Sequence, residues 1–270
     1  MKHRVILWRI PLVCIVLAAA TLPSSAATKT PASKPTPAPK IDPQATQMLR
    51  RMTDYLTSLN QFTVHVDSTM EVITPSGQVL NTDKSVDVSV MRPDHLRVES
   101  HVPDHDRQFY YDGKTLTIYS PKHNVYAVMD APPTIDALIQ LARQRGMQLP
   151  LADLVVSDPY PALMKDTISA IYVGQSLVGN TMTNQLAFQR KGLEWQIWIE
   201  DGPNALPLRV GIADKSVPGS PRFMANMTDW NVNPALDVGV FTFVPPADAR
   251  KVPFRPKQQT PAAAGRGKGK

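Results

Sequence analysis

Alternation of apolar and polar residues with a period of two is the feature that most constrains this chain. It is clearest at residues 109–128, FYYDGKTLTIYSPKHNVYAV, which read as two β-strands joined by a turn. Leu116 and Ile118 share the apolar face of the first strand, with Tyr119 and the threonines on the other. Asp112-Gly113 precedes it as a turn in which glycine can adopt a positive φ. We expect this hairpin to be apolar on one side and solvated on the other.

The same alternation recurs in about eleven segments, separated by turns rich in Gly, Pro, Asn and Asp. The predicted strands are Phe62–Val72, Val86–Val90, Leu96–Glu99, Leu116–Tyr119, Val125–Met129, Ile171–Val178, Thr183–Gln189, Glu194–Glu200, Leu206–Ala213, Arg222–Trp230 and Val238–Val244. Because strands do not alternate with helices as βαβ units, the pattern argues for an antiparallel sheet. A sheet with this many strands must curl.

Helical spacing of apolar residues appears in two places. Asp42-Pro43 is typical of a helix start, and apolar residues then recur every three or four positions to about Asn60. Thr134 can cap a second helix that ends near Gly146, and shorter helical turns follow between residues 150 and 169. The fold class we expect is α+β, mainly β, with helices covering the apolar side of the sheet.

The two ends of the chain differ in composition from its middle. Residues 1–27 have basic residues, a short apolar run and small residues, which predicts a cleaved signal peptide and export. Residues 28–40 form a Pro/Ala/Lys-rich linker, and residues 250–270 form a basic tail that we expect to be disordered. The single cysteine, Cys14, lies in the signal, so the mature chain would have no disulfide.

The net charge of +6 resides in these ends. Three basic residues lie in the signal, three in the linker and seven in the tail, which leaves 16 of the 29 in residues 41–249, against 23 acidic residues. The folded part is therefore acidic, which does not support a basic nucleic-acid-binding surface and predicts no nucleic-acid partner. The basic tail could make peripheral contact with an anionic membrane surface, although a solvated end is the simpler interpretation.

Three segments together resemble a known superfamily. They are residues 42–66, DPQATQMLRRMTDYLTSLNQFTVHV, then VSVMRPDHLRVE with Arg92-Pro93, and then the 109–128 hairpin with Asp112-Gly113-Lys114-Thr115-Leu116. In this order they resemble the periplasmic lipoprotein carrier and receptor (LolA/LolB-like) superfamily. EWQIWIEDGPNALPLRV and MTDWNVNPALDVGVFTFVPP extend the resemblance to a family of predicted periplasmic proteins, domain of unknown function 2092. The matches cover most of residues 42–249.

This resemblance implies a half-open β-barrel in residues 41–249, with helices plugging its concave face and an apolar cavity between them. It implies a periplasmic location and a lipid or acyl-chain ligand. From the inward faces we expect ligand contacts from Met48, Met52, Leu56, Met70, Val88, Leu116, Ile118, Leu138 and Trp195. Plain core packing remains open for Trp195 and the methionines. Arg92 would contact the helical plug, or it could be a simple turn residue.

Enzymatic signals are weak by comparison. His95, His101 and His105, with Asp104 and Asp106, could ligate Zn²⁺, but their spacing fits no metal motif and a solvated loop is the favoured interpretation. There is no Gly-x-Ser-x-Gly motif and no glycine-rich phosphate loop. We therefore expect a periplasmic, non-enzymatic protein without cofactor or metal that binds a lipid, an acylated protein or another apolar ligand. The alternative is a regulatory or scaffold module that binds an envelope protein.

Overall fold

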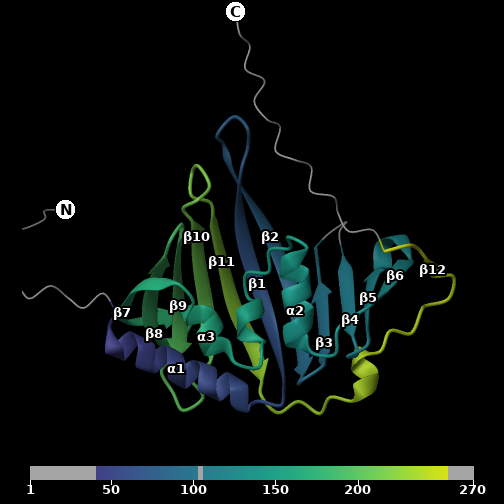
Figure 1. Ribbon diagram of the computed structural model, residues 1–270, viewed down its shortest axis with the longest axis horizontal. Coiled ribbons are helices and arrows are strands. Elements are labelled where there is room, and N and C mark those ends of the chain that lie inside the picture. The colour runs from purple at the N-terminus through teal and green to yellow at the C-terminus, as the bar shows by residue number, and fades with distance from the viewer. Residues whose placement is uncertain (1–40, 103–105, 255–270) are drawn as a thin grey trace, which may run out of the picture. The chain divides into compact units, whose positions relative to one another are not determined.

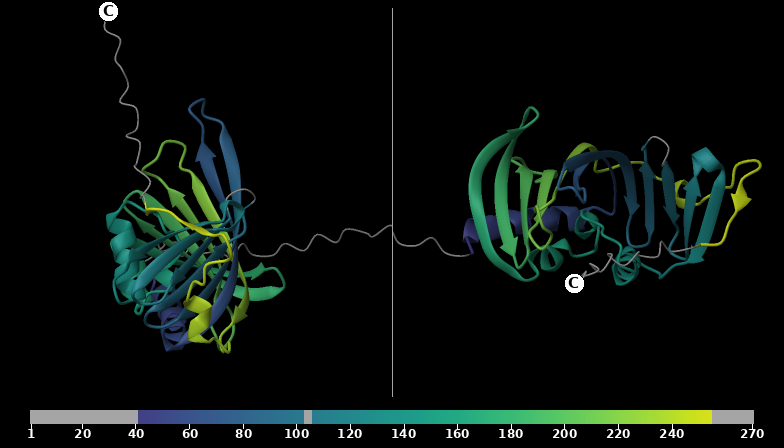
Figure 2. Two further views of the ribbon diagram at one scale, coloured as in Figure 1. Left: turned by 90° about the vertical axis from the view of Figure 1, so that its right-hand side faces the viewer. Right: turned by 90° about the horizontal axis from the view of Figure 1, so that it is seen from above.

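Twelve strands form one curled sheet in the computed structural model, which describes residues 41–102 and 106–254. The strands are β1 (Gln61–Ile73), β2 (Val79–Met91), β3 (His95–Ser100), β4 (Arg107–Tyr111), β5 (Thr115–Ser120), β6 (Val125–Asp130), β7 (Thr167–Val178), β8 (Thr181–Arg190), β9 (Leu193–Glu200), β10 (Pro207–Asp214), β11 (Arg222–Asn231) and β12 (Arg250–Lys251). Strands β12 and β7 are its two edges, so the sheet does not close into a barrel (Figures 1 and 2). The predicted curled, half-open sheet is confirmed.

Two antiparallel meanders make up the sheet. Strands β1 to β6 follow one another across one half and β7 to β11 across the other, and the halves join where β1 pairs with β11. Only β12, which runs parallel to β6, departs from antiparallel pairing among the described strands. Consecutive strands can pair because tight turns connect them. At Gly113 φ is +79°, as predicted, and the Asp112 carboxylate accepts the Thr115 N–H at 2.7 Å.

Three α-helices lie on one side of the sheet, which we call the concave face because the sheet curls around it (Figure 2). They are α1 (Pro43–Ser58), α2 (Ile135–Gln144) and α3 (Pro159–Met164), and the 3₁₀ turn η2 (Ala152–Leu154) lies with them. Both predicted caps are present. Asp42 accepts the Gln44 N–H at 2.8 Å, and the Thr134 hydroxyl accepts the Ala137 N–H at 3.2 Å.

The helices cover the concave face unevenly. Helices α1 and α3 contact each other, and α1 crosses β7 and β8. Helix α2 lies in front of the middle of the sheet, and none of the three α-helices lies in front of β4, β5 and β6 (Figure 1). Half of the apolar face is therefore under helices, and the other half has partial cover.

The predicted strand Val238–Val244 is wrong. Val238–Phe241 is a 3₁₀ turn (η3) capped by Asp237, whose carboxylate accepts the Gly239 N–H at 2.7 Å, and the chain then continues without ladder pairing. The sheet instead contains β4, whose residues were not predicted as a separate strand. The alternation in VGVFTFV reflects side-chain packing rather than strand pairing, because Phe241 and Phe243 pack against aromatic rings of the sheet.

These phenylalanines cover the convex face, which was expected to be solvated. The Phe243 ring lies 5.1–5.3 Å, centroid to centroid, from the rings of Tyr110, Tyr119 and Tyr126. As a result Tyr119 and Thr117 are buried, so the prediction of a solvated face here is wrong. The aromatic contacts hold the C-terminal segment, residues 232–249, across the sheet until it reaches β12.

The sheet extends beyond residue 249. Arg250 and Lys251, assigned from the sequence to the basic tail, form β12 beside Val125 and Tyr126 of β6. The predicted signal peptide and linker, residues 1–40, lie outside the described residues, as do residues 255–270 of the tail. All described residues belong to one compact unit.

Candidate ligand-binding face

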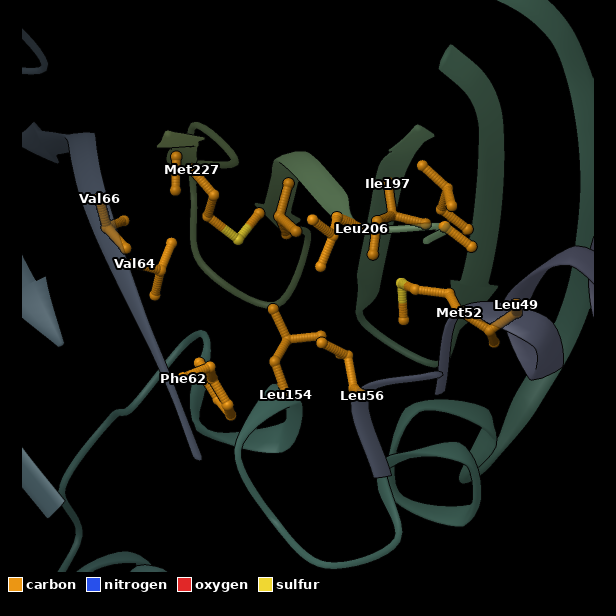
Figure 3. Close-up of a cluster of buried hydrophobic side chains, with 14 of the residues drawn as sticks. Leu49, Met52, Leu56, Phe62, Val64, Val66, Leu154, Ile197, Leu206 and Met227 are labelled. Carbon is orange, nitrogen blue, oxygen red and sulfur yellow. The ribbon is translucent and has the colours of Figure 1, made fainter. Parts of the chain in front are cut away.

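The concave face over β8 to β10 is filled by side chains. Leu49, Met52 and Leu56 of α1 are fully buried and point toward Ile197 and Leu206 from the sheet (Figure 3). The cavity between these strands and the helical insertion, residues 150–163, has a volume of only about 50 Å³. That is room for a few water molecules, whereas ligand pockets occupy roughly 300–1,000 Å³. This half of the molecule is a packed core.

Trp195 belongs to that core. Its ring stacks on Phe188 with centroids 4.2 Å apart and planes 11° from parallel, and it is 6% exposed. Met48 is half-buried against the same core, next to Met52 and Leu56. These predicted ligand contacts belong to one hydrophobic cluster or pack against it, and the cavity beside it is small.

The concave face over β2 to β6 is different. Five apolar residues, one from each strand, stand opposite one another in register and form what we call the apolar row: Val88, Val98, Phe109, Ile118 and Ala127. Paired residues of antiparallel strands project from the same face. All five are half-buried, and only Val88 packs against the buried core of the described residues. The row is an apolar surface that the fold leaves partly open.

A second row lies two residues along the same strands from the apolar row. Leu96, Tyr111 and Leu116 are in register with Val90. Tyr111 and Val90 belong to the same buried cluster as Leu138 of α2, and Leu96 and Leu116 pack against that cluster. The fully buried Tyr111 hydroxyl donates to the Pro132 carbonyl at 2.5 Å, and burial raises its pKa to about 12. This bond fixes the chain that leads into α2 over the second row.

The predicted contacts lie in several places. Met48, Met52, Leu56 and Trp195 are in the packed half, Leu138 is on α2, Leu116 is in the second row, and Val88 and Ile118 are in the apolar row. Met70 is half-buried on β1, opposite Thr82 and Phe223, beyond the helices. Sequence reasoning missed Val98, Phe109 and Ala127, although the alternation in LRVE at 96–99 places Val98 on the same face as Leu96.

Arg92 connects the sheet to the helical elements. Its guanidinium donates to the carbonyls of Leu59, at 3.2 Å, of Val155, at 2.6 Å, and of Val156, at 2.8 Å. Burial lowers the pKa of Arg92 below its ordinary value, and the Asp136 carboxylate opposes that shift. One side chain thereby joins the end of α1 to the insertion that follows α2.

The structure does not assemble the predicted histidine loop. His95 and His101 lie at opposite ends of β3, on the order of 20 Å apart. His95 bonds Asp94 at 2.6 Å, and His101 bonds Asp87 at 2.7 Å. His105 and Asp104 are outside the described residues, and within residues 41–102 and 106–254 no three His, Cys, Asp or Glu side chains are placed to hold a metal ion.

A different histidine pair meets on the convex face. Asp87 accepts from His65 Nδ1 at 2.6 Å through one oxygen and from His101 Nε2 at 2.7 Å through the other, and Asp67 lies 3.3 Å from His65 Nε2. The hydrogen bond to Asp87 raises the pKa of His65 above its ordinary value of 6.5. The same bond, with that from His101, lowers the pKa of Asp87. These contacts bridge β1, β2 and β3.

We expect His65 to make stability depend on pH. Because its folded-state pKa is raised, its contribution is fully present below its unfolded-state pKa and is lost as pH rises through the folded-state pKa. The protein should therefore resist urea better at about pH 5.5 than at about pH 8. In His65→Gln this difference should shrink by on the order of 0.5–1 kcal/mol, since Asp87 is half exposed. An unchanged difference would refute the assignment.

Comparison with known proteins identifies the family. The model of a family described as predicted periplasmic protein (DUF2092) matches residues 45–255. The chain belongs to this family. This assignment confirms the resemblance of the sequence to the family of predicted periplasmic proteins, domain of unknown function 2092, and with it the periplasmic location. A comparison with curated proteins found no match.

Solved structures of similar fold share little sequence with this family member. One is the lipoprotein LppX of Mycobacterium tuberculosis, at 15% identity, covering 73% of this chain and 100% of LppX, with a TM-score of 0.45. Another is a LolA-superfamily protein of Nitrosomonas europaea, at 11% identity, covering 74% of this chain and 97% of the other, with a TM-score of 0.40.

Within the described residues, no helix combines the length and apolar composition that a membrane span requires.

Proposed function

We propose that this protein is a non-enzymatic periplasmic binding protein that holds a lipid, an acylated protein or another apolar ligand on its concave face. The observation that carries the proposal is the apolar row, Val88, Val98, Phe109, Ile118 and Ala127, which is in register yet half-buried. An apolar surface of this kind is favourable to cover, because each CH₂ group of a ligand buried there contributes about 0.8 kcal/mol.

The dimensions of the row suit an acyl chain. Five adjacent strands spaced about 4.8 Å apart give a row roughly 19 Å long, which matches an extended fatty-acyl chain. The row crosses the strands at right angles, so a linear ligand would contact one side chain per strand. Helix α2 lies beside it, and a shift of α2 would add Leu116 and Leu138 to the contact surface.

Lipid that co-purifies with the protein tests this proposal. Native mass spectrometry of protein prepared without detergent should show a bound lipid mass, and the delipidated protein should enhance the fluorescence of an acyl-chain probe. Protein that carries no lipid and leaves the probe unchanged would contradict the proposal. Recovery of one stoichiometric envelope protein by the lipid-free protein would favour the regulatory or scaffold alternative.

A further inference from the structure

Charged residues are segregated between the two faces of β1 to β6. All six acidic residues of these strands are on the convex face, as the strand registers show: Asp67, Glu71, Asp83, Asp87, Glu99 and Asp130. The concave positions of the same strands carry no acidic residue and two basic ones, Lys84 and Arg107. On β1 to β6, the face that holds the apolar row therefore carries only positively charged side chains, although the folded part of the chain is acidic overall.

The two concave cations are close to the row. Arg107 precedes Phe109 by two positions on β4, so it lies on the same face, and Ser100 and Val86 continue its register line across the sheet. Lys84 is two residues beyond Val86 on β2. Standard sheet spacings place the Lys84 and Arg107 Cα atoms on the order of 12 Å apart. Side chains of this length can converge on one small anion between them.

Neither cation is in an ion pair within the described part of the chain, although Lys84 lines a hollow at the β1–β2 hairpin together with Asp67 and Asp83. Lys84 and Arg107 are exposed, and no carboxylate among the described residues pairs with them. Two acidic residues of the helical side, Asp136 of α2 and Asp153 of the insertion, have other partners. Asp136 accepts the Ser157 N–H at 2.8 Å, and Asp153 pairs with Arg143 at 2.7 Å.

A third cation approaches from the helical side. Arg145 caps the C-terminal end of α2, and its Nη1 lies 3.6 Å from the sulfur of Met129. Met129 is the β6 residue two positions from Ala127 on the same face. Positive charge thus borders the apolar row on both of its long sides.

We infer that the ligand is an anionic amphiphile with a single acyl chain. Its apolar chain lies along the apolar row, and its carboxylate or phosphate head group sits between Lys84 and Arg107. This inference rests on the proposed function, since it assigns a chemical class to the ligand of the same surface. The charge segregation between the two faces of the strands carries it, because an uncharged lipid would gain nothing from a cationic border.

Paired probes with identical chains test the inference. Binding of palmitate, of palmitoyl lysophosphatidate and of the uncharged hexadecanol to the delipidated full chain is measured by displacement of a fluorescent acyl probe. We expect one of the anionic probes to bind about tenfold more tightly than hexadecanol, as two exposed ion contacts allow. The preferred anion identifies the head group as carboxylate or phosphate. The preference should decrease as salt is raised.

Substitutions then test which residues cause the preference for the anionic probe. Lys84→Gln with Arg107→Gln should remove the preference for the anionic probe and leave hexadecanol binding unchanged. The matched control, Lys191→Gln with Arg222→Gln, removes two exposed cations far from the row, one in the turn between β8 and β9 and one on β11, and should retain the preference. Equal binding of charged and uncharged probes by the wild-type protein would overturn the inference and leave the proposed function standing. Binding of none of the probes would overturn the proposed function itself.

Discussion

Arg92→Ala is expected to lower the free energy of unfolding by about 3 kcal/mol. The substitution removes three hydrogen bonds from a buried guanidinium and leaves the carbonyls of Leu59, Val155 and Val156 without that donor. It also leaves a void where α1, the insertion and the sheet meet. Urea denaturation followed by circular dichroism, with midpoint and m-value fitted separately, measures the change.

Two further variants serve as comparisons. The first separates the role of geometry at Arg92 from that of charge, and the second is a control at an exposed arginine. Arg92→Lys keeps the charge, but one ammonium cannot reach both Leu59 and Val156, so stability should recover only in part. Arg222→Ala removes an exposed arginine of β11 and should change stability by less than about 0.5 kcal/mol. A loss below about 1 kcal/mol in Arg92→Ala would mean that Arg92 does not hold these elements together.

Replacement of both Phe109 and Ile118 by Gln is expected to weaken binding of an acyl ligand by at least about tenfold. Each Gln side chain places an amide where the ligand chain would cover it. Burying such a polar group without a hydrogen-bond partner costs roughly 1–3 kcal/mol of binding free energy. Because Gln is uncharged, palmitate and hexadecanol should lose affinity equally. The side chains are half-buried and lie outside the packed core, so the fold should persist. Displacement titrations with the fluorescent probe measure the loss.

The matched control for this double variant lies on the far edge strand. Val173 of β7 is 52% exposed and distant from the row in the strand order, so Val173→Gln tests an apolar-to-polar change outside the proposed site. Its affinity should equal that of the wild type. Unchanged ligand affinity in the double variant, with the fold intact, would show that the apolar row is not the binding surface.

Local signals in the sequence were enough to predict most of the secondary structure. The caps at Asp42 and Thr134, the turn at Gly113 and the alternation in most of the predicted strands depend on neighbouring residues, and all are present in the structure. The exception is Val238–Val244, where the same alternation belongs to a segment that packs without pairing. A period of two shows that a segment has two faces, but it does not show whether a ladder partner exists.

The sequence by itself determined that this chain is a mainly β protein with an antiparallel, curled sheet and helices on its apolar side. Only the tertiary structure decided which apolar residues are covered. Trp195 and Ile118 are equivalent in the sequence pattern, yet one is in a packed core and the other in a half-buried row. The segregation of charge, with Arg107 on one face and Asp87 on the other, likewise depends on strand register. Register and helix placement are set by contacts between distant segments, which local periodicity does not encode.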